Sequence, residues 1–141
     1  MFLLDTNVIS ELRRAKSGKA DAQVLAFMAS LEASALYVSV ITLMELEVGV
    51  LLRERTDPRA GASLRAWFDH QVRPEFVDRT IPIDVAVAMH CAALHAQNPR
   101  SYRDALIASC AHIHGMTVIT RNIADFADMG VPLVNPWEEA P

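Results

Sequence analysis

The chain has 141 residues, of which 52% are hydrophobic and 21% charged, and a formal net charge of −4. This length and composition fit one folded domain over residues 1–141 and exclude a disordered chain. Two cysteines exclude a disulfide scaffold, and no apolar run reaches the ~18 residues of a membrane span. We therefore expect a cytoplasmic protein without a membrane segment.

The first half of the chain alternates short apolar segments with helical patterns. Residues 1–4 predict a strand buried on both faces, and the polar residues Asp5-Thr6-Asn7 favour the start of a helix that continues over residues 8–14. Apolar periodicity predicts helices over residues 21–31 and 41–55, with a strand over residues 36–38 between them. Asp57-Pro58 predicts a turn into a further helix near residues 62–68.

The second half continues the alternation. Residues 79–83 predict an edge strand, because Pro82 is poorly tolerated in a central one. Helices follow to about residue 96 and over residues 101–114, then a strand over 116–120, a short helix within 121–128 and a last strand over 131–134. The pattern predicts an α/β fold with a central parallel sheet of four or five short strands. Ligands of such sheets bind at the carboxyl ends of the strands.

Four carboxylates are expected at that rim of the sheet. Asp5 and Asp125 follow strands, while Glu45 and Asp104 lie near the starts of helices. Each acid alone fits a helix-capping role. Asp5, however, follows an apolar run, and Ser39 is a better cap for its helix than Glu45. Crowded carboxylates stay ionised most easily around a divalent cation, and oxygen ligands favour Mg²⁺ or Mn²⁺.

Five motifs, in this order, resemble the PIN-domain family. They are the opening apolar run with Asp5-Thr6-Asn7, the stretch Ser39…Thr42-x-x-Glu45-Leu46…Gly49, the helix Arg103-Asp104-Ala105-x-Ile107-Ala108, the segment Thr120-Arg121-Asn122-x-x-Asp125-Phe126, and the closing Val134-Asn135-Pro136-Trp137. The last motif is similar to the VapC and FitB branch, the toxins of bacterial toxin–antitoxin pairs. The resemblance covers residues 2–137.

The resemblance implies a three-layer α/β/α fold and Mg²⁺-dependent cleavage of RNA by a metal-activated water. The acidic metal ligands of the family carry over to Asp5, Glu45 and Asp104. We take Asp125 as the fourth ligand, with Asn122 as the alternative for that position. The resemblance also implies a homodimer and inhibition by a cognate antitoxin of the VapB or FitA type, with operator DNA bound only through that antitoxin.

Six further side chains are expected close to the carboxylates. Arg121 is a candidate phosphate contact, although an ordinary surface arginine is an equal alternative. The others are candidate hydrogen-bond partners that orient the carboxylates: Thr6, Asn7, Thr42, Thr120 and Asn122.

Rival functions differ in how well they fit the residues. A haloacid-dehalogenase-type phosphatase needs a second aspartate where the chain has Asn7, and a receiver domain needs a lysine near a late strand, whereas the only lysines are Lys16 and Lys19. A catalytically inactive PIN-like module that docks a partner protein remains as an alternative. Metal-dependent cleavage of RNA would distinguish the enzyme from this module.

Overall fold

The computed structural model describes residues 1–138. Within this range, five parallel strands form one sheet in the order β3-β2-β1-β4-β5. The strands are β1 (Phe2–Leu4), β2 (Leu36–Ser39), β3 (Thr80–Ile81), β4 (Thr117–Ile119) and β5 (Leu133–Val134). In the central strand, Phe2 pairs with Leu36 on one side and with Thr117 on the other. The predicted parallel sheet is confirmed, and β3 lies at an edge as predicted for residues 79–83, although it ends at Ile81, before Pro82.

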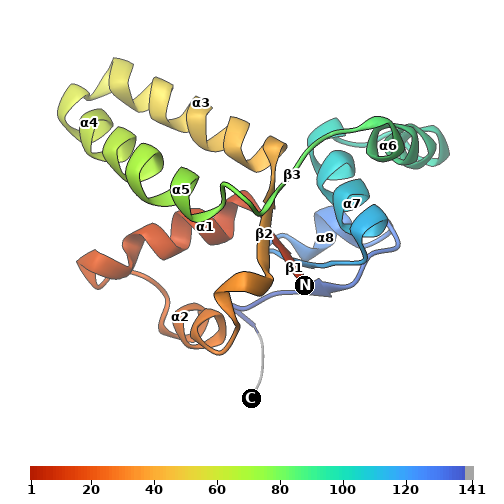
Figure 1. Ribbon diagram of the computed structural model, residues 1–141, viewed down its shortest axis with the longest axis horizontal. Helices are drawn as coiled ribbons and strands as arrows, with labels where there is room; N and C mark the ends of the chain where they lie inside the picture. Colours follow the sequence, from red (N-terminus) through yellow and green to blue (C-terminus); the bar gives the residue numbers. More distant parts are fainter. Residues whose placement is uncertain (139–141) are drawn as a thin grey trace.

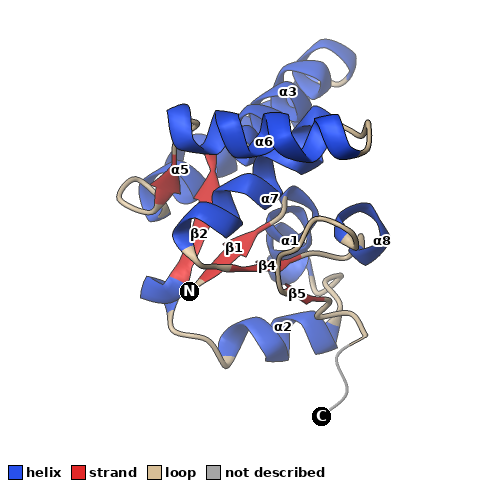
Figure 2. Ribbon diagram, turned by 90° about the vertical axis from the view of Figure 1, so that its right-hand side faces the viewer, coloured by secondary structure: helices blue, strands red, loops and turns tan. Residues whose placement is uncertain are grey.

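Helices cover both faces of the sheet, which gives the three layers that the sequence predicted (Figure 1). One layer contains α1 (Thr6–Arg13), α2 (Ala22–Ala29), α3 (Val40–Thr56), α4 (Pro58–Trp67) and α5 (Arg73–Glu75). The other contains α6 (Val85–Gln97), α7 (Tyr102–His114) and α8 (Ile123–Phe126). Figure 2 shows α6 and α7 lying side by side.

Each face of the sheet has its own hydrophobic core. Neighbouring residues of a strand point to opposite faces, so Leu3 packs with the α6 and α7 side chains while Leu4 packs with α1, α2 and α3. Both leucines are fully buried. A strand that is apolar throughout is therefore required at the centre of the sheet.

Capping residues explain where two of the helices begin. α1 begins at Thr6, within the start predicted at Asp5-Thr6-Asn7, because the Asp5 carboxylate caps it. α4 begins at Pro58 and not near residue 62, since Asp57 caps Ala60 and proline suits the first turn. A π-helical turn at Phe68–Val72 then joins α4 to α5, which was not predicted. Short 3-10 turns occupy Arg14–Ser17 and Ala33–Ala35.

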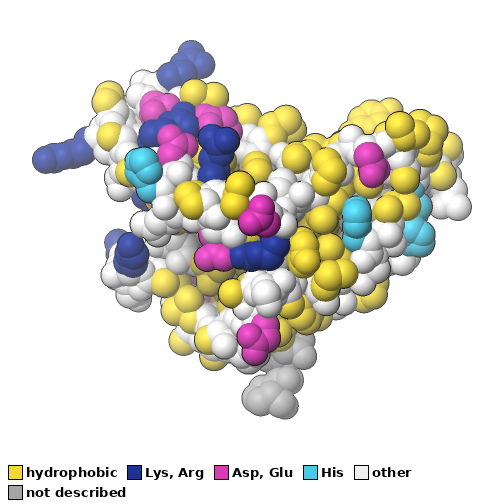
Figure 3. All heavy atoms as spheres, in the orientation of Figure 1, with side chains coloured by type: hydrophobic (Ala, Val, Ile, Leu, Met, Phe, Trp, Pro, Cys, Tyr) yellow, Lys and Arg dark blue, Asp and Glu magenta, His cyan; other side chains and the backbone are white. Residues whose placement is uncertain are grey.

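The antiparallel pair α3 and α4 is joined by charged side chains. Figure 3 shows acidic and basic groups gathered on one face over these two helices. Arg65 donates hydrogen bonds to Glu47 at 2.6 Å and to Glu54 at 3.2 Å. Gly61 is buried at the same contact, where an added Cβ would lie 2.5 Å from the Glu54 Cα atom. The helices therefore pack as closely as a glycine allows.

The carboxyl ends of the three central strands meet at one rim of the sheet. Asp5 follows β1, Ser39 ends β2 and Thr120 follows β4, and all three are fully buried. The Asp5 amide donates to the Ile119 carbonyl at 2.9 Å, which holds the ends of β1 and β4 together. Within residues 1–138, no helix combines the length and the apolar character needed to cross a membrane.

Candidate active site

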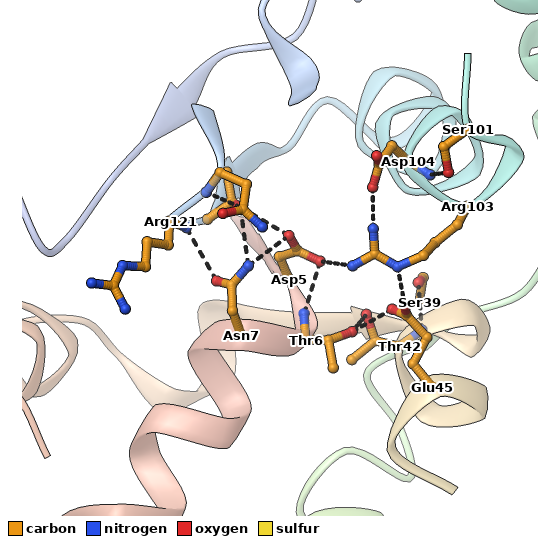
Figure 4. Close-up of polar contacts among 12 residues, drawn as sticks. Asp5, Thr6, Asn7, Ser39, Thr42, Glu45, Ser101, Arg103, Asp104 and Arg121 are labelled. Atoms are coloured by element: carbon orange, nitrogen blue, oxygen red, sulfur yellow. Dashed lines mark hydrogen bonds and ion pairs between the residues drawn. The ribbon is translucent and has the colours of Figure 1, made fainter. Parts of the chain in front are cut away.

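Asp5 is the most tightly held acid of the rim (Figure 4). Its Oδ1 accepts a hydrogen bond from the Thr6 amide at 2.8 Å. Its Oδ2 accepts from the Thr120 hydroxyl at 2.8 Å and from the Asn7 side-chain amide at 3.0 Å. Burial of a carboxylate is costly unless such donors satisfy its oxygens. Asp5 is thus both the cap of α1 and a fixed part of the site.

Two further hydrogen bonds hold in place the side chains that donate to Asp5. The Asn7 Oδ1 accepts from the Arg121 amide at 3.1 Å, which orients the Asn7 side chain. The Thr120 Oγ1 accepts from the Asn122 amide at 3.0 Å while it donates to Asp5. The chain after β4 is therefore tied to the start of α1 through these two side chains.

Glu45 reaches the rim from the second turn of α3. Ser39 caps this helix by accepting from the Thr42 amide at 3.2 Å, as predicted, so Glu45 is free of a capping role. The Glu45 Oε1 accepts from the Thr6 hydroxyl at 2.5 Å, and that hydroxyl lies 3.4 Å from the Thr42 Oγ1. Thr42 is fully buried. The Thr6 contact therefore joins the Glu45 carboxylate to the residue that follows Asp5.

Asp104 comes from the first turn of α7. Its amide donates to the Ser101 Oγ at 3.4 Å, which caps the helix and leaves the carboxylate free to face the site. Burial raises the pKa of Asp104, the nearby Arg103 lowers it, and the negative charges of Asp125 and Asp5 raise it further. The net direction is upward, as expected for a carboxyl among like charges.

Arg103 lies at the centre of the three carboxylates, a placement that the sequence did not predict. Its Nη2 is 3.5 Å from the Asp5 Oδ1. Its Nη1 donates to Asp104 and its Nε donates to Glu45, so one guanidinium contacts three acids from three elements (Figure 4). The only signal in the sequence was a basic residue directly before an acid in the first turn of a helix.

Three other candidates lie farther from this centre. Asp125 is exposed on α8, and its negative charge contributes to the raised pKa of Asp104. Asn122 is exposed and joins the network through its backbone amide. The Arg121 guanidinium lies 5.1 Å from the centre of the Trp137 ring, pointing away from Asp5. The structure thus brings Asp5, Glu45 and Asp104 together around one cation and leaves the side chains of Asp125, Asn122 and Arg121 outside that contact.

The residue types at the centre fit a hard divalent cation, because carboxylate oxygens are the ligands that Mg²⁺ and Mn²⁺ prefer. Asp5, Glu45 and Asp104 already converge on one positive group. Across residues 1–138, however, no three Asp, Glu, His or Cys side chains are grouped closely enough to hold an ion.

The family model, the related sequences and the solved structures that match this chain all indicate the same protein family. Residues 2–131 match the model of the PIN domain. The chain is 35% identical to VapC ribonuclease Y4jK of Sinorhizobium fredii, covering 99% of this chain and 100% of that protein. It is also 35% identical to toxin FitB of Neisseria gonorrhoeae, with 99% and 100% covered. A solved structure of FitAcB from Neisseria gonorrhoeae superposes with a TM-score of 0.88 at 33% identity, covering 99% of this chain and 100% of the matched one. The chain therefore belongs to the PIN-domain family, and proteins of the FitB and VapC type are among its full-length relatives.

Proposed function

We propose that this protein is a Mg²⁺-dependent endoribonuclease and the toxin of a toxin–antitoxin pair. The observation that carries the proposal is the convergence of Asp5, Glu45 and Asp104, from three separate elements, on a single cation at the carboxyl rim of the sheet. Full-length relatives named as a VapC ribonuclease and as toxin FitB support the reaction class. Mn²⁺ satisfies the same ligands.

Residues of this chain would hold the ion and orient the carboxylates that bind it. Asp5, Glu45 and Asp104 would hold the ion, and the exposed Asp125 would act at the outer edge of the site, through water. When bound, Mg²⁺ supplies Lewis-acid stabilisation of the phosphate charge and activates water for hydrolysis. Thr6 donates to one Asp5 oxygen and Asn7 and Thr120 donate to the other, so the carboxylate would keep its direction during the reaction. Thr6 also fixes Glu45, with Thr42 behind it.

The charge of the site is compatible with an RNA substrate once a cation is present. Asp5, Glu45, Asp104 and Asp125 together equal the whole formal charge of −4. A divalent cation among them removes much of the repulsion that a phosphate backbone would meet. The acidic composition is therefore no obstacle to RNA binding at the loaded site.

Protein partners are part of the proposal. Similar solved chains come from structures of FitAcB and of FitAB, the second bound to an IR36 DNA fragment. By analogy, a cognate antitoxin of the VapB or FitA type would inhibit this chain and would supply the contact to operator DNA, and the toxin would form a homodimer. The exposed apolar side chains of α3 support a protein contact: Met44, Val48, Leu51 and Leu52.

Cleavage of a cellular RNA pool tests the enzymatic proposal. Purified, antitoxin-free protein should cut RNA with Mg²⁺ and stop cutting with EDTA. Asp5→Asn should abolish cleavage, whereas Asp128→Asn, which alters an exposed acid paired with Arg100, should leave it unchanged. Folded, Mg²⁺-supplied protein that leaves every RNA intact would favour the catalytically inactive docking module instead.

A further inference from the structure

The carboxylate cluster contains its own countercharge. Arg103 contacts Asp5, Glu45 and Asp104 with three different nitrogen atoms. Two of these acids are deeply buried, since Asp5 is 0% and Asp104 8% exposed. Charged groups that are this buried need a partner, and guanidinium has the planar set of donors and the permanent charge to serve several carboxylates at once.

We propose that Arg103 is a displaceable internal cation, which holds the metal-free cluster together and must withdraw before a divalent cation can bind. This inference rests on the proposed metal site. It adds that the Arg103 guanidinium and the divalent cation compete for the same three carboxylates. The metal-free state is then blocked by the protein's own arginine, and each binding event exchanges one positive group for another.

The spacing of the acids supports this competition. With the guanidinium between them, the acids of residues 1–138 form no group of three that is close enough to hold one ion. An ion that contacts Asp5, Glu45 and Asp104 together would need the place where the Arg103 guanidinium now contacts all three carboxylates. A guanidinium carries one positive charge and Mg²⁺ carries two, so the ion is the stronger partner for three negative groups.

The position of Arg103 allows the exchange. Its side chain is 34% exposed, so one side of it already faces solvent. It is the second residue of α7, and its long side chain can turn outward while Asp104, the next residue, keeps its capped position. In the proposed exchange, rotation about the side-chain bonds of Arg103 carries the guanidinium outward.

A fixed structural role is the opposing explanation. In that case Arg103 stays in place, orders the three carboxylates and helps them to bind the ion. The two explanations predict opposite effects of removing the positive charge. A displaced cation competes with the ion, so its removal strengthens binding; a fixed one supports the site, so its removal weakens binding.

The test is calorimetric titration of the full chain with Mn²⁺, together with thermal unfolding in EDTA. Arg103→Gln should bind Mn²⁺ about tenfold more tightly than the wild type and should unfold at a temperature several degrees lower in EDTA. Arg100→Gln is the matched control, because Arg100 precedes the same helix but pairs with Asp128 outside the cluster. This control should leave Mn²⁺ affinity unchanged. Equal or weaker Mn²⁺ binding by Arg103→Gln would overturn the inference.

Asp5→Asn separates this inference from the proposed function. If Asp5→Asn binds Mn²⁺ as well as the wild type, the proposed metal site itself is wrong. If Asp5→Asn loses binding but Arg103→Gln shows no gain, the site stands and only the competition fails.

A measurement on the wild type covers the case in which Arg103→Gln does not fold. The Arg103 Nε–H signal in nitrogen-edited NMR should be protected from solvent exchange in EDTA and should exchange rapidly after Mg²⁺ is added. A signal that remains protected at saturating Mg²⁺ would show that Arg103 stays in place, which contradicts the inference.

Discussion

Thr6 donates a 2.5 Å hydrogen bond from its hydroxyl to the Glu45 Oε1 atom, which joins the first residue of α1 to the second turn of α3. The adjacent amide of Thr6 donates to Asp5. One residue therefore sets the direction of two of the three central carboxylates.

Thr6→Val keeps the shape of this side chain but removes the bond to Glu45. A hydrogen bond to a charged group contributes about 1.5–3 kcal/mol, so we expect kcat/KM for RNA cleavage to fall roughly 10- to 100-fold. Thr56→Val is the control, because its exposed hydroxyl donates to the Leu52 and Arg53 carbonyl groups of its own helix. Initial rates at saturating Mg²⁺ measure both variants, and an unchanged rate for Thr6→Val would show that Glu45 does not need this contact.

Thr120→Val should destabilise the fold. The hydroxyl of Thr120 is fully buried and both donates to Asp5 and accepts from the Asn122 amide. Loss of both bonds leaves a buried carboxylate and a backbone amide without one partner each, at a cost of about 1–3 kcal/mol. Urea unfolding measures this cost. Thr117→Val, at the other end of β4, is the matched control, and equal stability losses in the two variants would contradict the account.

Gly61→Ala tests the close approach of α3 and α4. The new Cβ would lie 2.5 Å from the Glu54 Cα, so the helices must separate, and we expect a loss of about 1–3 kcal/mol in the free energy of unfolding. Gly49→Ala is the comparison, since apart from the backbone of its own helix no atom of residues 1–138 lies within 4 Å of the new Cβ, and alanine favours helix. Chemical denaturation should therefore show opposite signs for the two substitutions; a neutral Gly61→Ala would refute the close packing.

The pH dependence of stability should include a contribution from His90. Burial, assisted by the neighbouring His112, lowers the pKa of His90 below its ordinary value of 6.5. The unfolded chain then binds a proton near pH 6.5 that the folded chain does not yet bind, so stability falls as the pH drops below that value. The slope from this group reaches at most about 1.4 kcal/mol per pH unit.

His90→Gln removes this contribution and retains a polar partner for Ser109, whose hydroxyl lies 2.9 Å from the His90 ring. Unfolding free energies at pH 7.5 and pH 5.5 should therefore differ less in His90→Gln than in the wild type. His70→Gln alters an exposed histidine and should keep the wild-type difference. An identical pH dependence in all three proteins would contradict the role assigned to His90.

Much of the fold could be predicted because its strands are short and apolar and its caps are local. The run before Asp5 has no polar face, so it had to be central. Ser39 and Asp57 cap their helices through hydrogen bonds to residues three positions away, which the sequence makes visible. The start of α4 was misplaced because the cap at Asp57 was interpreted as a turn.

The side-chain contacts of the site were less predictable, because they join distant segments. Arg103 and Asp104 are adjacent on a helix, where neighbouring residues point in different directions, and only the length of the arginine side chain brings both groups to one place. Arg121 was a candidate phosphate contact with an ordinary surface arginine as an equal alternative, and its guanidinium lies over Trp137, sixteen positions along the chain. Neither placement follows from local sequence patterns.

Analysis of the RNA product ends tests the central claim most directly. If Asp5, Glu45 and Asp104 form a metal-dependent hydrolytic site, cleavage in ¹⁸O-labelled water with Mg²⁺ should place one ¹⁸O atom in each newly formed terminal phosphate, with no 2′,3′-cyclic phosphate. The same reaction should not occur in EDTA or with Asp5→Asn. Cyclic phosphate ends formed in EDTA would show that the RNA 2′-hydroxyl attacks without a metal, and would contradict this account of the site.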